Sequence, residues 1–517
     1  MPHFSKVYAA ELEGIDARLI EVETDINVGL HNFTIVGLAD KALNEAKERV
    51  NSALKNIGVK APNRENRRIT VNLAPADVKK NGSHYDLSIA IGYLLATEQI
   101  KKFDTKKILL VGELSLDGQL RSISGALNMA RLAARDGFQE IILPAENAVE
   151  AAIVAGLTVT PAPNLLSLIA HLEGKAKLPP QPKTEIQDAG RKTSQGVDIS
   201  EIRGQKNAKR ALAIAAAGGH NMLMIGSPGG GKTMLAQALA SILPGMTLEE
   251  VIDVTQIYSA AGLLNGRPIV ANRPFRAPHH TASPISIVGG GANILPGEVS
   301  LAHRGVLFLD ELPEFRRDLL ESLRQPMEAG VVHISRAKGH LSFPAKFSLI
   351  AAMNPCPCGY HGDEEKECRC TANEVFRYQK KMSGPLLDRI DLQIAVPRMK
   401  PEELTTSEPN PNEGQEIRGA IAQARAAQAE RFKKAGLGRQ IFTNAELTSR
   451  ETEKLIELEP GAKTFLELNL KKQKLSARGY YRILKTAQTV ADLTGSPIVT
   501  EDHLAESFGY RLRDDER

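Results

Sequence analysis

Three runs of mostly apolar residues stand out in the middle of the chain, because each one ends at a polar or glycine-rich stretch. The runs are Leu223–Ile225, Val306–Leu309 and Phe347–Met353. Short apolar runs without alternating polar residues are typical of parallel strands that are buried on both faces. A helical pattern follows the first run, at Met234–Ala240. We therefore expect a parallel α/β sheet here, with the polar stretches at the carboxyl ends of its strands.

The N-terminal part has a different pattern, in which short strands alternate with helices up to about residue 175. Strands are expected at Phe33–Gly37 and Arg68–Leu73, and helices at Ala39–Ile57 and Asp86–Thr97. This pattern indicates an α+β domain that is separate from the central sheet.

Proline-rich stretches mark the boundaries between the expected domains. One begins at Pro179 and another covers residues 400–412, and such stretches are typical of linkers. After the second, helical patterns at Gln415–Lys434 and Ser476–Thr494 occur without strands. The expected organisation is an N-terminal domain, a linker, an α/β core and a helical C-terminal domain, at residues 1–178, 179–196, 197–400 and 401–517.

Composition narrows the classes of function. A chain of 517 residues with 42% hydrophobic residues is long enough for about three domains. Aromatic residues make up only 4% and Trp is absent, which disfavours a base-stacking platform as the main nucleic-acid surface. The net charge of +4 is too small to identify a nucleic-acid binder. We find no apolar run of transmembrane length and no signal-peptide core, so we expect a cytoplasmic protein without membrane contact.

The glycine-rich stretch after the first apolar run fits the pattern G-x-x-x-x-G-K-[ST] of a phosphate-binding P-loop. Its residues are Gly226, Ser227, Pro228, Gly229, Gly230, Gly231, Lys232 and Thr233. Glycines let the backbone N–H groups point at phosphates, and the following helix adds a favourable dipole. Lys232 is expected to reach the β- and γ-phosphates of ATP, and Thr233 to hold Mg²⁺.

The second apolar run ends in two carboxylates, which predict that the chain hydrolyses the nucleotide as well as binding it. Asp310 is expected to bind the Mg²⁺ of the nucleotide, and Glu311 to orient and polarise the attacking water. An apolar strand that ends in Asp-Glu is often only structural. Its position after a P-loop favours the catalytic interpretation, that of a Walker B motif.

All four cysteines lie close together after the third run, which excludes a secreted disulfide scaffold. Cys356, Cys358, Cys368 and Cys370 form two C-x-C pairs. Four thiolates suit a tetrahedral structural Zn²⁺, although C-x-C is tighter than the usual C-x₂-C. The alternatives are reduced structural cysteines, or His361 in place of one ligand.

Further motifs resemble those of ring-forming AAA+ ATPases. Asn354 ends a buried strand as the sensor 1 residue does, so the resemblance implies that it positions the attacking water. The stretch 384–391 resembles the box that carries an arginine finger, here Arg389, and 475–479 resembles sensor 2, with Arg478. Arginine at the γ-phosphate neutralises the charge of the transition state. Ile202–Gln205 resembles the adenine-side element of the same class.

The segment between the P-loop helix and the second run resembles the insertion of MCM helicases and magnesium chelatases. It contains Arg273–Ser283 and three consecutive glycines, 289–291. Val332–Phe343 is expected to form a hairpin with a basic tip that includes Arg336 and Lys338. The corresponding hairpin of MCM-type rings faces the DNA channel, so the resemblance implies that these two residues contact DNA.

The N-terminal stretches 109–120 and 141–147 resemble the Lon protease domain. Together with the chelatase-like AAA+ core, they make the whole chain similar to the ComM/YifB family. That resemblance implies a Lon-like α+β domain, an AAA+ P-loop domain with a parallel sheet and a helical lid. It also implies a homohexameric ATPase that drives branch migration of single-stranded and branched DNA in natural transformation and homologous recombination.

The Lon-like domain departs from an active protease. The stretch Lys80–Asp86 has His84 in the position of the nucleophile and Ser83 one place away, and no lysine occurs between Lys107 and Lys175. A serine without its base is a weak nucleophile, so we expect a structural or docking module rather than a protease. Two alternatives remain for the whole chain: a magnesium-chelatase-type motor subunit, against which the Lon-like domain argues, and an ATP-dependent protein remodeller.

Overall fold

The computed structural model contains two compact units. The first combines residues 1–188, 248–270 and 335–343, and the second combines residues 189–247, 271–334 and 344–517. The structure describes residues 3–37, 41–64, 66–80, 82–184, 197–264, 266–291, 294–336, 339–399, 410, 412–473 and 476–511. None of the helices in these ranges has both the length and the apolar character that a membrane crossing requires.

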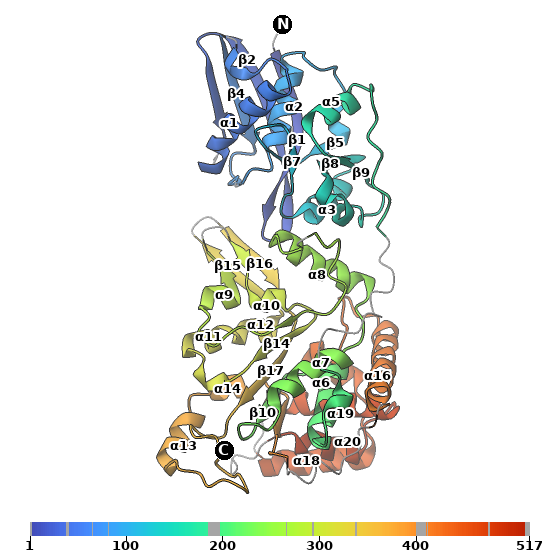
Figure 1. The fold of residues 1–517 in the computed structure, drawn as a ribbon. Coiled ribbons are helices and arrows are strands. Elements are labelled where there is room, and N and C mark those ends of the chain that lie inside the picture. Colours follow the sequence, from blue (N-terminus) through green and yellow to red (C-terminus); the bar gives the residue numbers. More distant parts are fainter. Residues whose placement is uncertain are drawn as a thin grey trace. The chain divides into compact units, whose positions relative to one another are not determined.

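In the described residues, the first unit is built on a seven-stranded mixed sheet of order β3-β4-β2-β1-β5-β8-β9 (Figure 1). The strands and a small β6–β7 pair are β1 (His3–Glu13), β2 (Asp16–Val28), β3 (Asn32–Val36), β4 (Arg67–Ala74), β5 (Ile108–Leu110), β6 (Glu113–Leu114), β7 (Leu120–Arg121), β8 (Glu140–Pro144) and β9 (Thr158–Ala162). The helices of residues 1–188 are α1 (Lys41–Asn56), α2 (Asp86–Ala96), α3 (Ala126–Arg135), α4 (Ala148–Ala151) and α5 (Leu165–Leu172).

At the beginning of the chain, the structure differs from the expected alternation of short strands and helices. β1 and β2 are long strands that pair antiparallel over their whole length, from His3 with Ile26 to Glu13 with Asp16. Their side chains alternate between two cores: Val7 belongs to the core that contains α2, and Ala10 to the core that contains α3. A strand buried on both faces lacks a simple polar–apolar alternation, which applies to β1, whereas β2 alternates between buried and less buried residues from Ile20 to Ile26. The predicted strands and helices farther along this domain are confirmed.

Helix α8 (Leu248–Ala260) follows the P-loop helix in sequence but belongs to the first unit. It packs against α3. The Ser259 hydroxyl donates to the Glu150 carboxylate over 2.6 Å, and the Ser259 carbonyl accepts from the Gly125 N–H over 2.8 Å. Ser259 and Glu150 are both buried. Residues from the middle of the chain therefore complete the core of the N-terminal unit.

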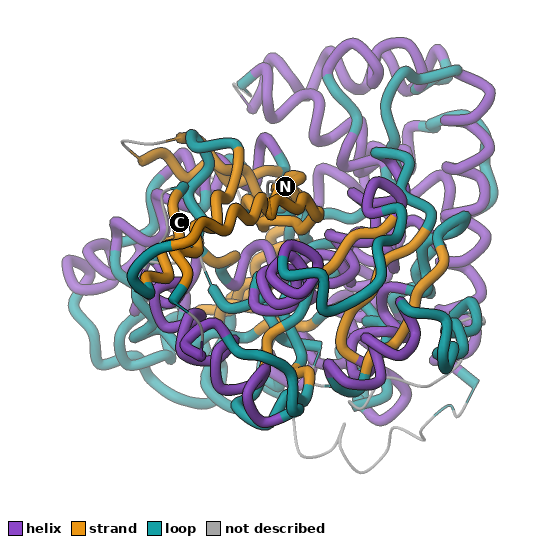
Figure 2. The backbone as a smooth tube through the Cα atoms, turned by 90° about the horizontal axis from the view of Figure 1, so that it is seen from above, coloured by secondary structure: helices purple, strands orange, loops and turns teal. Residues whose placement is uncertain are grey.

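The second unit contains the expected parallel sheet. In the described residues it has five strands in the order β11-β14-β17-β10-β18, and every neighbouring pair is parallel. The strands are β10 (Met222–Ile225), β11 (Phe275–Arg276), β14 (Val306–Leu309), β17 (Ser348–Met353) and β18 (Leu392–Ala395). Figure 2 shows the mixture of strands and helices. The three predicted runs form the three central strands, so their polar ends lie at one edge.

Helices cover both faces of this sheet. Met222 and Met224 face one core, which includes residues of α6, α7, α16 and α19, whereas Leu223 faces the other. Besides the five strands, the helices and short strands of this unit before residue 400 are α6 (Lys206–Gly218), α7 (Lys232–Ile242), α9 (Pro284–Val288), β12 (Gly289–Gly290), β13 (Leu295–Pro296), α10 (Glu298–Leu301), α11 (Arg317–Ser322), α12 (Arg324–Ala329), α13 (Ala372–Gln379) and α14 (Gly384–Leu387). β15 (Val331–Arg336) and β16 (Gly339–Pro344) form the predicted hairpin.

The C-terminal region is helical, as predicted. Its helices are α16 (Glu413–Ala435), α17 (Ser449–Leu455), α18 (Pro460–Gln473), α19 (Ala477–Thr494) and α20 (Glu501–Gly509). Arg304 and Lys346 flank the sheet, and both donate to the carboxylate of Glu446, over 3.2 and 3.0 Å. Burial alone would raise the pKa of Glu446, but the charges of Arg304 and Lys346 outweigh burial and lower it. This ion cluster joins the helical region to the core.

We expect Glu446→Gln to destabilise the second unit, because it leaves two partly buried cations without their anion. Loss of one partner of a buried ion pair costs about 3–5 kcal/mol of unfolding free energy. Since folding lowers the pKa of Glu446, its contribution is complete above the unfolded pKa of about 4.3 and is lost as pH falls through the folded pKa. Urea unfolding at pH 7 and at pH values below about 4.3 should show a difference that narrows only in the more acidic range. Glu430→Gln, in an exposed pair with Lys434, is the control, and a difference independent of pH would contradict the assignment.

Candidate functional site

The P-loop joins β10 to α7, and its shape requires glycine at several positions. Gly229 and Gly231 have φ angles of +83° and +82°, which glycine adopts without strain. A Cβ at Gly226 would lie 2.0 Å from the carbonyl oxygen of Val396, so only glycine fits beside the loop that follows β18. The backbone N–H groups at the beginning of α7 are thus left free of side-chain bulk, as a phosphate site requires.

Lys232 is the first residue of α7, and its ammonium group lies within the P-loop. Nζ donates to the carbonyls of Gly226 and Ser227 over 2.7 and 3.1 Å, and to Oδ1 of Asn354 over 3.1 Å. Burial lowers the pKa of Lys232, and the charges of Asp310 and Glu311 oppose this effect. The structure therefore brings the predicted P-loop lysine and the predicted sensor 1 residue together.

Thr233 and Asp310 also meet, as their predicted shared role requires. Oγ1 of Thr233 donates to Oδ2 of Asp310 over 2.8 Å. A hydroxyl and a carboxylate are oxygen ligands of the kind that Mg²⁺ prefers, and Mg²⁺ in nucleotide sites uses one or two such protein ligands besides phosphate oxygens. The pair therefore fits the ion that accompanies ATP in AAA+ ATPases.

Glu311 lies next to this pair in an unusual backbone conformation. Its φ is +51°, a left-handed value that is uncommon for residues other than glycine. Its side chain is 59% exposed, and Oε2 lies 3.8 Å from Nδ1 of His280. His280 lies in the predicted insertion, where the sequence indicates no role for it. Only the fold reveals that the insertion reaches the predicted catalytic carboxylate.

A cavity of about 460 Å³ adjoins Glu311 and Asn354 and is lined by further charged residues that the sequence analysis missed. Among them, Lys381 pairs with Glu314 over 3.2 Å. Burial, together with the charges of Glu314 and Glu311, raises the pKa of Tyr378 to about 12. The phenol therefore stays protonated beside the predicted water-orienting groups.

The two predicted arginines meet each other at a different place. Glu328 of α12 accepts from Arg389 over 2.8 Å and from Arg478 over 2.7 Å. The Arg389 side chain is only 4% exposed, whereas that of Arg478 is 58% exposed. Within the described residues, the ion pairs of both arginines lead to Glu328 rather than to the P-loop. No feature of the sequence singled out Glu328, because a glutamate in a short helix is usually a surface residue.

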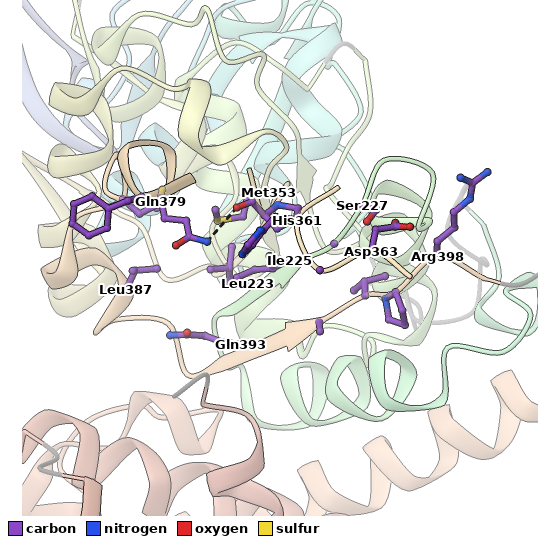
Figure 3. Close-up of a pocket in the computed structure, with 18 of the residues that line it drawn as sticks. Leu223, Ile225, Ser227, Met353, His361, Asp363, Gln379, Leu387, Gln393 and Arg398 are labelled. Atoms are coloured by element: carbon purple, nitrogen blue, oxygen red, sulfur yellow. Dashed lines mark hydrogen bonds between the residues drawn. The ribbon is translucent and has the colours of Figure 1, made fainter. Parts of the chain in front are cut away.

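The four cysteines form one cluster without disulfide bonds. Their four Sγ atoms lie within 4.8 Å of one another, and three of the distances are 3.4, 3.6 and 3.7 Å. Tetrahedral zinc with Zn–S bonds of about 2.3 Å requires sulfur atoms about 3.8 Å apart. The arrangement thus fits the predicted Zn²⁺. His361, the alternative ligand, instead lines a cavity of about 900 Å³ beside the P-loop (Figure 3).

Two other predicted sites have different outcomes. The predicted DNA contacts, Lys338 and the side chain of Arg336, lie outside the described residues. In the Lon-like domain, the Ser83 hydroxyl donates to the Glu113 carboxylate, and the fully buried Lys80 donates to the Pro75 carbonyl. Each of these two side chains thus has its own partner, Glu113 for Ser83 and Pro75 for Lys80.

Comparisons with known families agree with this geometry. The model described as "Magnesium chelatase, subunit ChlI" matches residues 198–404, and "Subunit ChlI of Mg-chelatase" matches residues 22–147. "Magnesium chelatase, subunit ChlI C-terminal" matches residues 412–511. The parallel sheet, the P-loop and the carboxylates at its edge therefore define an AAA+ ATPase of the magnesium-chelatase type, a class that uses ATP and Mg²⁺.

Similarity over the full length identifies the family. "Competence protein ComM" of Haemophilus influenzae is 43% identical over 509 residues, which cover 98% of this chain and 97% of that protein. YifB of Escherichia coli is 41% identical over 511 residues, 99% of this chain and 97% of that protein. The chain belongs to the ComM/YifB family. The magnesium-chelatase 38 kDa subunit of Acidiphilium rubrum is 27% identical over only 61% of this chain, although this covers 91% of that subunit.

Two substitutions separate nucleotide binding from turnover. Lys232→Ala should abolish ATP binding, because the phosphates lose their main side-chain partner. Glu311→Gln should keep ATP bound and stop hydrolysis, because the amide cannot polarise the attacking water. Equilibrium binding of a fluorescent ATP analogue and phosphate release check both results. Hydrolysis by the Gln variant at the wild-type rate would show that Glu311 is not the water-orienting group.

Proposed function

We propose that the chain is the subunit of a homohexameric, ATP-driven motor that promotes branch migration of single-stranded and branched DNA in natural transformation and homologous recombination. The observation that carries this proposal is the arrangement of its ATPase groups on a chain that is similar to competence protein ComM along almost its whole length. The P-loop groups meet at one place, and the two arginines meet at another. A ring of identical chains would bring the two arginines of one chain to the P-loop groups of the next chain.

In this proposal each residue of the nucleotide site has one role. The backbone of Gly226–Gly231 and the ammonium group of Lys232 bind the phosphates of ATP. Thr233 and Asp310 hold Mg²⁺, which neutralises phosphate charge. Glu311 accepts the proton of the attacking water, and the amide of Asn354 orients that water. The Lys232–Asn354 distance of 3.1 Å supports a single site for these groups.

Arg389 is proposed to act on the nucleotide of a neighbouring subunit, and Arg478 to act as the sensor 2 arginine at a γ-phosphate. Their shared carboxylate, Glu328, carries one negative charge against two positive charges, so a net positive charge remains at this place. Such a charge suits the γ-phosphate of an adjacent chain, where arginine stabilises the transition state.

The remaining parts of the proposal concern DNA, zinc and the N-terminal domain. Arg336 and Lys338 are proposed to bind the DNA backbone from the tip of the β15–β16 hairpin. The four cysteines are proposed to bind one structural Zn²⁺, which the spacing of their sulfur atoms supports. The N-terminal domain is proposed to be a structural or docking module without peptidase activity, which the lack of a lysine between Lys107 and Lys175 supports.

The proposed DNA function predicts stimulation of ATP hydrolysis by single-stranded or four-way DNA, and loss of binding in a hairpin variant. Arg336→Ala with Lys338→Ala should weaken DNA binding and junction movement together, because phosphate contacts supply sequence-independent affinity. Basal ATP hydrolysis should remain. Lys101→Ala with Lys102→Ala, which removes the same charge from exposed residues between helix α2 and strand β5, is the control. A wild-type protein that hydrolyses ATP but does not bind DNA would instead support a chelatase-type motor or a protein remodeller.

The trans assignment predicts complementation between two inactive variants. Arg389→Ala should lose most turnover, since an arginine finger is worth about 10³–10⁵ in rate in GTPases. Mixing it with Lys232→Ala should partly restore hydrolysis, because some interfaces then combine an intact P-loop with an intact arginine. Phosphate release by the mixture, with native mass spectrometry to verify mixed rings, measures this. Mixed rings without any recovery would contradict action in trans.

A further inference from the structure

Residues 355–371, called here the cysteine loop, connect the predicted sensor 1 strand β17 to helix α13. All of these residues are described, and they form turns without a helix or strand. Within the loop, only Cys356 and Gly359 are buried. An irregular segment without a hydrophobic core does not repay the conformational entropy of its ordering. Cross-linking by a metal at the four cysteines would supply the missing stabilisation.

The cysteine loop also packs directly against the beginning of the P-loop. A Cβ built on Gly359, whose φ is +87°, would lie 2.6 Å from Cδ of Pro228. The Gly359 N–H donates to the carbonyl of Cys356 over 3.0 Å. The turn that carries the first two cysteines therefore also determines where the loop contacts Pro228.

A second pair of side chains connects the cysteine loop to the P-loop. The Ser227 side chain lies near Asp363 and is the first cause of the lowered pKa of Asp363. Figure 3 shows Ser227 and Asp363 next to each other at one end of the cavity. Farther along the loop, Glu365 pairs with Arg398 over 3.7 Å, in the segment whose Val396 carbonyl contacts Gly226.

These contacts involve two residues of the P-loop. Phosphate binding does not require a particular side chain at either position. Ser227 and Pro228 occupy variable positions of the G-x-x-x-x-G-K-T pattern. Their backbone nevertheless leads into the glycines whose N–H groups must face the phosphates. Holding this turn in place reduces the ordering that nucleotide binding must impose, which increases affinity.

We propose that metal binding by the four cysteines and nucleotide binding by the P-loop are positively coupled, and that the cysteine loop transmits this coupling through Gly359–Pro228 and Asp363–Ser227. The metal site is then an effector site for ATP binding rather than only a fold stabiliser. Coupling between two binding sites is reciprocal, so bound nucleotide must also retain the metal. This inference rests on the proposed zinc site but not on the proposed DNA function.

The first experiment measures both directions of the coupling in the full chain, without DNA. Protein purified in reductant is expected to contain about one zinc per chain by elemental analysis. Removing zinc with a chelator should weaken binding of a fluorescent ADP analogue by about fivefold or more, and adding zinc should restore it. Saturating ADP should slow zinc release to a chromogenic chelator by a similar factor. Unchanged nucleotide affinity in folded, zinc-free protein would overturn the proposal, and so would the absence of zinc from the purified protein.

Variants that keep all four cysteines separate coupling from folding. Asp363→Ala should retain one zinc per chain, bind nucleotide more weakly, and lose most of the protection of zinc by ADP. Glu367→Ala removes an exposed carboxylate from the same loop and should match the wild type. Ser227→Ala combined with Asp363→Ala should add little to either change alone, because both remove the same side-chain interaction. If Asp363→Ala and Glu367→Ala protect zinc equally well in the presence of ADP, the loop does not transmit the coupling.

Discussion

Parallel pairing of β10 with β17, and of β17 with β14, is the constraint on which the nucleotide site depends. Ile225 lies opposite Met353, and Leu309 lies opposite Ala351. The next residue of each strand is therefore at the same edge of the sheet, where the strands of parallel sheets present ligand-binding groups. The contacts of Lys232 with Asn354 and of Thr233 with Asp310 follow from this register. A shift of one residue in either pairing would separate these groups and turn buried side chains to the wrong face.

The same unit places its two arginines away from this edge. The edge carries carboxylates, an amide and a lysine, whereas the two guanidinium groups share the carboxylate of Glu328. Under the proposed action in trans, the two places complete one chemistry only when identical chains face each other in a fixed order. Burial of Arg389 fixes its guanidinium group within the chain, so less side-chain entropy would be lost if a neighbouring nucleotide bound there.

How much the sequence predicts depends on whether a signal is local. The P-loop, the central strands and the C-terminal helices were predicted because their residues are contiguous and their periodicity is simple. The meeting of Lys232, Asp310 and Asn354 followed from one rule about parallel strands. The strand β1 was missed because consecutive residues of it are buried on both faces, which disturbs alternation, whereas the alternating residues of β2 were overlooked. Glu328, His280 and Asp363 were missed because each gains its importance from a residue far away in sequence, and an isolated charged or polar residue carries no pattern.

Helix α8 has a consequence for how the protein is made. Gly125 and Glu150 obtain their partner at Ser259, a residue that the ribosome adds only after the P-loop and α7. The N-terminal unit therefore cannot reach its final packing while it emerges alone. Glu150 accepts from Asn147 within the N-terminal unit, but its hydrogen bond from Ser259 forms only after β10, α6 and α7 of the second unit have been synthesised. Folding of the two units is thus interleaved during translation.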